Sequence, residues 1–217
     1  MESILSNLRK NSVLAACAAS ASICFLVLVG WQFEIEFLKS VLPSFISMKV
    51  NTAIGGILLS GAIACLRRGD RASTSARVAS AVFALLALSI GLATLAEYQL
   101  NLNFGIDEFF FKDVGAIRSG SPGGRLSPAT ALCFIFLAAS ALTGLLPASR
   151  SMIKYSQGAA FLAFLLSFQG IVGYLIGFHY NFGNAYYARI AVHTAVFVNC
   201  LSLAALGLYP NQGFVSG

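Results

Sequence analysis

Charged side chains are scarce in this chain. Lysine, arginine, aspartate and glutamate together make up 10% of its 217 residues, whereas 58% of the residues are hydrophobic. Soluble globular domains carry about 25% charged residues. The composition therefore excludes an ordinary soluble domain and indicates a chain whose main partner is a lipid bilayer.

Paired cysteines and catalytic motifs are also missing. The chain has no CxxC pair, no HExxH, GxSxG or P-loop motif, and no GxGxxG that follows a strand. Its five cysteines all lie inside apolar runs, which is typical of small apolar core residues. They are Cys17, Cys24, Cys65, Cys133 and Cys200. We therefore expect neither enzyme activity nor a metal site, and the sequence identifies no cofactor.

Long hydrophobic runs are abundant instead. A bilayer core about 30 Å thick requires about 20 helical residues, and six charge-free runs are close to this length. They are Val13–Trp31, Val50–Leu66, Val78–Ala96, Leu126–Leu146, Tyr155–Phe178 and Ile190–Tyr209. In the first run small residues precede bulky ones, the reverse of a cleaved signal peptide, so we expect this helix to be retained. The sequence predicts an all-α integral membrane protein with six transmembrane helices in a single domain, residues 1–217.

A short sequence motif recurs three times and predicts an internal repeat. The Thr-Ala pairs at Thr52, Thr130 and Thr194 each open an apolar run, and a small residue follows eight positions later. These small residues are Ser60, Ala138 and Ser202. The order and spacing favour three helical hairpins with a pseudo-threefold repeat, at about residues 13–66, 78–146 and 155–209. We expect the three Thr-Ala helices to meet at the small residues.

The distribution of basic residues predicts the orientation. With six spans, the denser group of lysines and arginines lies on the side of the two termini, and that side is cytoplasmic by the positive-inside rule. This group is Arg9, Lys10, Arg67, Arg68, Arg71, Arg77, Arg150 and Lys154. Connections 32–49, 97–127 and 179–189 then lie outside. The net charge of +6 reflects this rule, and we expect no nucleic-acid partner.

The outer connections carry most of the chain's polar chemistry. The stretch 34–46 mixes bulky apolar and charged residues and favours a short helix in the membrane interface. Ser127-Pro128 is a typical N-cap and first-turn pair for the next helix. We interpret the acidic residues of the second connection as solvated loop charge, with a cation site as the alternative. They are Glu97, Asp107, Glu108 and Asp113.

Two sets of residues inside the helices predict how the helices pack. Gln169 and Asn199 each lie nine residues from a helix end that flanks the third connection. Antiparallel neighbours would place them at one depth, so we predict a hydrogen-bonded polar pair, with ligand binding as the alternative. The small-residue pairs Gly173/Gly177 and Gly56/Ser60 predict close approaches between helix backbones. Both follow the small-xxx-small pattern.

One hypothesis concerns a ligand at the outer surface. Lys49, Arg125 and Arg189 lie three to five residues before a repeat threonine, and Asn51 and His193 lie directly before one. Converging hairpins would gather these groups around three helix N-termini. The resulting outward-facing opening would suit an anionic or carbonyl-bearing small molecule. The alternative is that the threonines cap their helices and the cations extend to lipid headgroups.

Several of these stretches carry a family resemblance. They are Met48-Lys49-Val50-Asn51-Thr52-Ala53, Gly124-Arg125-Leu126-Ser127-Pro128 and Val192-His193-Thr194-Ala195. They resemble the N-terminal multi-pass membrane sensor region of bacterial PAS-containing histidine kinases and diguanylate cyclases. The chain departs from that pattern at Leu126, where methionine is usual, and at Ala129, where asparagine is usual. The family's region normally leads into cytoplasmic output domains, so we expect this chain to be either a truncated sensor portion or a stand-alone relative that works with a partner.

The resemblance implies a sensory input module in the bacterial inner membrane. Such a module relays an outer-face or intramembrane signal to a cytoplasmic output domain or protein partner. The alternative is a non-catalytic structural or assembly subunit of a larger membrane complex. A transporter ranks third, because transport usually requires charged or broken helices at the midplane. The signal is not identified, and a homo-oligomer stays open.

Overall fold

The computed structural model describes residues 2–42, 45–69, 72–113, 122–147, 149–176 and 190–209. Every regular element in these ranges is a helix, which confirms the predicted all-α class. The elements are α1 (Glu2–Gln32), α2 (Glu36–Lys39), α3 (Val50–Leu66), α4 (Thr74–Leu100), α6 (Pro128–Thr143), α7 (Arg150–Leu175) and α8 (Val192–Leu206).

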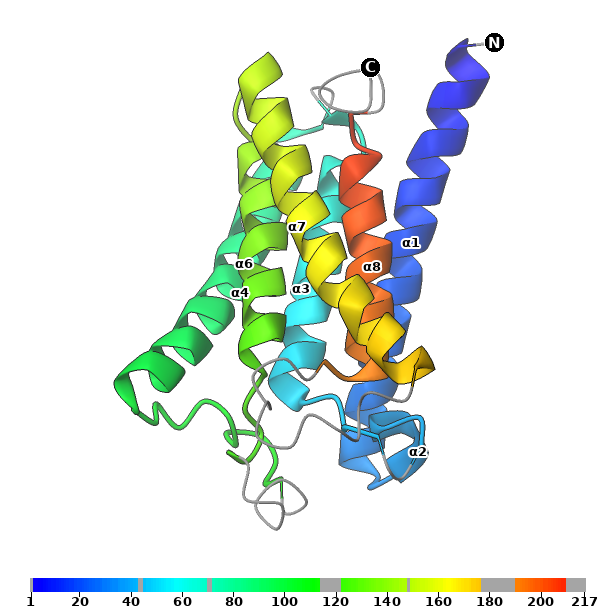
Figure 1. The fold of residues 1–217 in the computed structure, drawn as a ribbon. Coiled ribbons are helices and arrows are strands. Elements are labelled where there is room, and N and C mark those ends of the chain that lie inside the picture. Colours follow the sequence, from blue (N-terminus) through cyan, green and yellow to red (C-terminus); the bar gives the residue numbers. More distant parts are fainter. Residues whose placement is uncertain are drawn as a thin grey trace.

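The long helices form an upright bundle with two distinct ends (Figure 1). Helices α1, α4 and α7 run in one direction, and α3, α6 and α8 run back. We call the end at which α3, α6 and α8 begin the α2 end, because α2 lies there. The opposite end, where α1 begins and α8 finishes, is called the N-terminal end.

Three helices are long and apolar enough to cross a membrane: Asn7–Gln32 within α1, Thr74–Leu100 and Arg150–Leu175. Helices α3, α6 and α8 are also apolar but shorter, at 17, 16 and 15 residues. By length and composition, the three long helices are compatible with a membrane protein.

Hydroxyl side chains fix where several helices begin. Ser127 accepts a hydrogen bond from the backbone N–H of Thr130, and Pro128 occupies the first turn, which confirms the predicted start of α6. Ser73 and Ser149 cap α4 and α7 in the same way. Each cap satisfies a backbone donor that has no partner inside its own helix.

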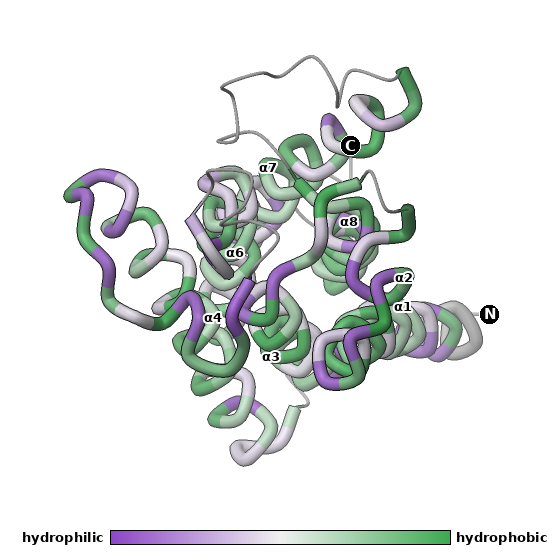
Figure 2. The backbone as a smooth tube through the Cα atoms, turned by 90° about the horizontal axis from the view of Figure 1, so that it is seen from below, coloured by the Kyte–Doolittle hydropathy of each residue, from purple (hydrophilic) through white to green (hydrophobic). Residues whose placement is uncertain are grey.

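The three short helices lie against one another, and the long helices surround them. Helices α3, α6 and α8 contact each other in all three pairings, while α1 contacts α3 and α8, α4 contacts α3 and α6, and α7 contacts α6 and α8. Figure 2 views this arrangement from the α2 end. Ser60, Ala138 and Ser202 are all buried in it.

The centre of the bundle is filled by two phenylalanine rings that enter spaces left by glycines. A Cβ atom added at Gly55 would lie 2.0 Å from Cε2 of Phe134, and one added at Gly56 would lie 2.4 Å from Sγ of Cys24 and 3.0 Å from Cε2 of Phe197. The groups that approach Gly56 are side chains from α1 and α8, so the predicted close approach of two helix backbones is not what this glycine provides. These rings are among the largest fully buried side chains, so α3 supplies the space that α6 and α8 fill.

The predicted close approach at Gly173 is wrong. Within the described part of the chain, no heavy atom lies within 4 Å of a Cβ added there, and its pattern partner Gly177 lies outside that part. The buried face of α7 instead runs through Ile153, Ser156, Gln157, Ala160, Ala163 and Ser167. Gly173 is not part of that face, so a glycine pattern alone did not identify the packed side of the helix.

Charges are divided unequally between the two ends. The described N-terminal end holds Arg9, Lys10, Arg67, Arg68, Arg77, Arg150 and Lys154. The acidic residues at the α2 end are Glu34, Glu36, Glu97, Asp107, Glu108 and Asp113. Hydrophilic stretches at this end stand out in Figure 2 against largely apolar helices. The α2 end is consequently where polar chemistry is concentrated.

Candidate functional site

The segment 101–113 returns from the end of α4 across the α2 end of the bundle. Asn101 ends α4 in a left-handed conformation, with φ of 50°. Asn103 Oδ1 then accepts a hydrogen bond of 2.8 Å from the backbone N–H of Gly105, whose φ is +72°. Both positions suit residues that tolerate positive φ, so local sequence turns the chain back toward the bundle.

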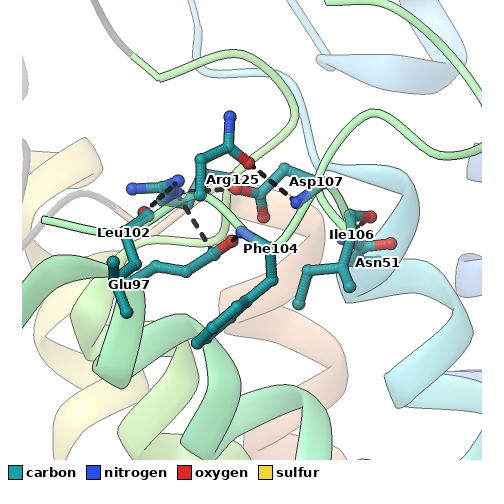
Figure 3. A network of polar contacts seen from close by, with 9 residues as sticks. Asn51, Glu97, Leu102, Phe104, Ile106, Asp107 and Arg125 are labelled. Atoms are coloured by element: carbon teal, nitrogen blue, oxygen red, sulfur yellow. Dashed lines mark hydrogen bonds and ion pairs between the residues drawn. The ribbon is translucent and has the colours of Figure 1, made fainter. Parts of the chain in front are cut away.

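A buried cluster of charges anchors this segment (Figure 3). Arg125 Nε donates to Asp107 Oδ2 at 2.6 Å and lies 3.4 Å from Glu97 Oε2. The Glu97 side chain is 0% exposed and Asp107 is 7% exposed. We call Glu97, Asp107 and Arg125 the charge cluster. It joins the last turn of α4 to two loop positions that are distant in sequence.

Backbone groups complete the charge cluster. Glu97 Oε1 accepts a hydrogen bond of 2.8 Å from the N–H of Phe104, and Arg125 Nη2 donates to the carbonyl of Leu102 at 3.3 Å. The Arg125 guanidinium also lies 5.4 Å from the centre of the Tyr98 ring. Burial alone lowers the pKa of Arg125, but its hydrogen bond to Asp107 and the nearby acidic charges outweigh this and raise the pKa. The guanidinium therefore stays ionised.

A glycine makes the close approach of Arg125 to Asp107 feasible. Gly124 has φ of +64°, and a Cβ atom there would lie 2.1 Å from the carbonyl oxygen of Asp107. The backbone before Arg125 thus lies directly against the backbone of Asp107. Any other L-residue at this position would have both an unfavourable φ and a steric overlap.

A second set of contacts ties the first hairpin to the same segment. Asn51 Nδ2 donates to the carbonyl of Ile106 at 2.9 Å, and Lys49 forms an ion pair with Asp113. The backbone N–H of Asp113 donates to Glu108 Oε1 at 2.9 Å. Because Lys49 and Asn51 lie at the start of α3, these contacts couple that helix to the connection after α4.

The corner between α1 and α3 is closed by Trp31. Its Nε1 donates to the carbonyl of Met48 at 2.8 Å, and the ring of Phe111 lies 6.2 Å away, centre to centre. Lys39 Nζ lies 5.0 Å from the Trp31 ring and pairs with Glu36 at 2.8 Å. This corner includes α2, which falls within the stretch for which a short helix is predicted.

The structure brings three of the five predicted ligand-binding residues to one segment. Lys49, Asn51 and Arg125 all bond to residues 102–113. Both cations are already paired with buried carboxylates, so they have no unpaired charge to offer an anion. His193 is half-buried at the start of α8, and its Nδ1 has no hydrogen-bond partner. Arg189 lies outside the described residues, as does His179, and the ligand hypothesis stays a prediction.

The acidic residues of this segment were expected to be solvated, and that expectation is wrong for three of them. Glu97, Asp107 and Asp113 are buried, the last with 4% exposure. Each is paired with a cation that lies nearby in the fold but far away in sequence. Sequence inspection missed these pairings because nothing local links Glu97 to Arg125. The one available signal was the position of Glu97 directly after a long apolar run.

The predicted hydrogen bond between Gln169 and Asn199 is also wrong. Asn199 is buried, but its Nδ2 donates to the carbonyl of Ala195 in its own helix at 2.7 Å, and its Oδ1 has no partner. Gln169 is exposed. It follows the buried Ser167 by two residues, which is a rotation of about 200° around the helix axis. Equal depth along the two helices therefore does not bring Gln169 and Asn199 together, because Gln169 lies on the outward face of α7.

Comparison with known proteins gave no match among family models, curated proteins or solved structures. The charge cluster and its neighbours must therefore be interpreted from their own chemistry.

Proposed function

We propose that this chain is the sensory input module of a bacterial signal-transduction protein, embedded in the inner membrane by six transmembrane helices. It relays a signal from its outer face or membrane interior to a cytoplasmic output domain or protein partner. The resemblance of its repeat motifs to a membrane sensor region of histidine kinases and diguanylate cyclases supports this proposal. Its activity is transmission, without catalysis.

The lengths and positions of the helices support six spans. At 1.5 Å per residue, α3, α6 and α8 are about 22–26 Å long, slightly less than the bilayer core of about 30 Å. They are surrounded by α1, α4 and α7, whose lengths are about 39 Å or more. Short helices are tolerated in the centre because the surrounding long helices, rather than lipid, cover their ends.

Three equivalent positions support the pseudo-threefold repeat of hairpins. Thr52, Thr130 and Thr194 are each buried, and each lies in the first turn of a central helix at the α2 end. Every long helix contacts two of the three central helices. One hairpin repeated three times about a central axis accounts for both facts.

The unequal charge distribution supports the orientation. The N-terminal end carries basic residues, while nearly all described acidic residues lie at the α2 end. By the positive-inside rule the N-terminal end is cytoplasmic and the α2 end is outside. A signal at the outer face then enters where the polar contacts are concentrated.

The buried charge cluster is the observation that carries the sensory proposal. Removing ionised groups from water costs several kcal/mol per group, so a purely structural subunit would be at least as stable with apolar residues. The cluster links α4 to the start of α6, and the neighbouring Asn51 and Lys49 contacts link the same segment to α3. A change there consequently reaches two of the three central helices.

Contacts at the N-terminal end support a route by which a movement leaves the bundle. Tyr209, just after α8, donates from its hydroxyl to the carbonyl of Gly144 at 3.3 Å. Gln157 on α7 donates from Nε2 to the carbonyl of Tyr209 at 3.0 Å. The chain leaving α8 is thereby tied to α7 and to the end of α6, so a shift of the central helices changes its position.

Distance measurements between spin labels test the proposal. Labels at Ser12→Cys on α1 and Ser151→Cys on α7 report the N-terminal end, because both residues are exposed. The five native cysteines are first replaced by alanine, and the protein is placed in lipid nanodiscs. Asp107→Asn should shift the label distance by about 1–2 Å, the usual scale of helix movements in signalling. Glu36→Gln, a similar change at an exposed carboxylate that pairs with Lys39, is the control.

The same experiment separates the two candidate functions. A structural or assembly subunit holds its helices in one arrangement, so Asp107→Asn and Glu36→Gln would both leave the label distance unchanged. That result would contradict the sensory proposal and favour the subunit.

A further inference from the structure

The charge cluster has an excess of negative charge. With ordinary ionisation, Glu97 and Asp107 contribute two negative charges and Arg125 contributes one positive charge, so the sum is −1. Lys49, which also contacts the segment 101–113, is paired with Asp113. An uncompensated charge that is removed from water is costly. A single additional positive charge would make the cluster neutral.

Three buried oxygen atoms also lack hydrogen-bond partners, two in the charge cluster and one on α4 a turn before Glu97. They are Glu97 Oε2, Asp107 Oδ1 and Thr94 Oγ1. Thr94 is 0% exposed and lies one turn before Glu97, on the same face of α4. Thr143 shows the usual alternative, since its hydroxyl donates to the carbonyl of Ala139 in its own helix. Thr94 makes no such bond, so its hydroxyl is left available to a carboxyl group.

We propose that the charge cluster is a proton-binding site in which Glu97 and Asp107 share one proton. The bound proton makes the cluster neutral and supplies an O–H donor to one of the unpartnered oxygens. Loss of the proton leaves two carboxylates competing for one guanidinium in a dehydrated site. The repulsion then loosens the segment 102–108 from α4.

The other charged and titratable groups near the site do not replace this proton. Arg125 faces both carboxylates, and the Tyr98 ring lies against its guanidinium. Glu108 accepts the N–H of Asp113 and adds no positive charge. Low pH therefore favours the state in which the segment 102–108 is held against α4. High pH favours the state in which this segment is loosened.

This inference deepens the proposed sensory function, on which it rests for its biological meaning, and makes the proton the signal. Its physical content is nevertheless independent of any output. Proton binding can be measured at the cluster itself, whereas relay is measured between labels at the N-terminal end. A failure of one is thus distinguishable from a failure of the other.

Infrared difference spectroscopy of the protein in nanodiscs tests the proton site. A protonated carboxyl has a C=O stretch that is resolved from the bands of carboxylates. Between about pH 5 and pH 9, the wild type should show this band at low pH and lose it as the pH rises. Protein labelled with ¹³C at the glutamate carboxyl, or separately at the aspartate carboxyl, identifies which residue type carries the proton.

Variants then assign the band to the cluster. Glu97→Gln and Asp107→Asn should each remove the pH-dependent band, while Glu36→Gln should keep it. A spin label at the exposed residue Phe109 (Phe109→Cys) should become more mobile at high pH in the wild type but not in Glu97→Gln. If a variant does not fold, the isotope shifts in the wild type still give the result.

Three outcomes would overturn the proposal. The first is a wild type with no pH-dependent carboxyl band. The second is a band that persists in both Glu97→Gln and Asp107→Asn. The third is a label mobility that depends on sodium rather than choline at fixed pH and ionic strength, which would show that an alkali ion supplies the positive charge.

Discussion

At the scale of single residues, the α2 end is organised by groups that compensate one another's burial. Glu97 is fully buried at the end of an apolar helix, where an isolated carboxylate would be strongly disfavoured. Arg125 and the N–H of Phe104 provide its partners. The stability of this end consequently depends on positions that lack charge themselves but allow the charged groups to meet.

Gly124 is the clearest of these positions. Gly124→Ala should destabilise the protein by about 1–3 kcal/mol more than Gly105→Ala. Both glycines have positive φ, so both substitutions carry the backbone cost, but only Gly124 has an atom within 4 Å of the added Cβ. Thermal unfolding in the same detergent measures the difference. Equal melting temperatures for the two variants would contradict the close approach to Asp107.

The ion pair between Lys49 and Asp113 should behave as a coupled unit. Asp113→Ala leaves the largely buried Lys49 ammonium without its carboxylate and should cost about 3 kcal/mol. Adding Lys49→Ala should recover part of that loss, because the uncompensated charge is then gone. A double-mutant cycle of unfolding free energies measures the coupling. Additive effects of the two substitutions would show that the pair contributes little.

Sequence inspection located part of this site and missed its chemistry. Lys49, Asn51 and Arg125 were grouped from their spacing before the repeat threonines, and the structure places all three against one segment. Their partners Asp107 and Asp113 were interpreted as solvated, because loop carboxylates usually are. Whether a loop folds back under a helix bundle depends on tertiary contacts that have no local signal.

At the scale of helices, hydrophobic length was a reliable guide, and polar or small-residue patterns were not. The predicted run Val50–Leu66 coincides with α3, and the other predicted runs overlap their helices with shifted ends. Lipid-facing and buried apolar positions both satisfy a hydrophobic run, so its length is informative while its buried face is not. That is why Gln169 and Gly173 were placed on the wrong side of α7.

Packing of the central helices should depend on Gly55. Gly55→Ala places a methyl group against the buried ring of Phe134 and should destabilise the protein by about 1–3 kcal/mol. Gly173→Ala is the matched control, since its Cβ meets open space and alanine is the better helix former by about 1 kcal/mol. Unfolding in detergent compares them.

A compensating substitution tests the cause of that loss. Phe134→Leu shortens the side chain that meets the new methyl group, so Gly55→Ala should cost less in the Phe134→Leu background than in the wild type. If Gly55→Ala costs the same in both backgrounds, contact with Phe134 is not the source of the destabilisation.

At the scale of the whole molecule, three hairpins and an uneven charge distribution produce a polar α2 end on an apolar bundle. The central helices α3, α6 and α8 all begin at that end. The segment 101–113 bonds to Asn51 in α3 and to Arg125, which lies three residues before α6, and so connects two hairpins. These contacts join the α2 end of the first hairpin to that of the second.

The orientation of this arrangement in the membrane is directly testable. We expect Asn103→Cys, in the segment at the α2 end, to react with a membrane-impermeant thiol reagent in intact cells, and Ser75→Cys, near the start of α4, to be protected until the membrane is permeabilised. Both residues are exposed, so accessibility to the reagent decides the result. The native cysteines are replaced by alanine to remove background. The reverse labelling pattern would place the basic end outside, contrary to the positive-inside rule, and labelling of both sites in intact cells would exclude a fixed six-span topology.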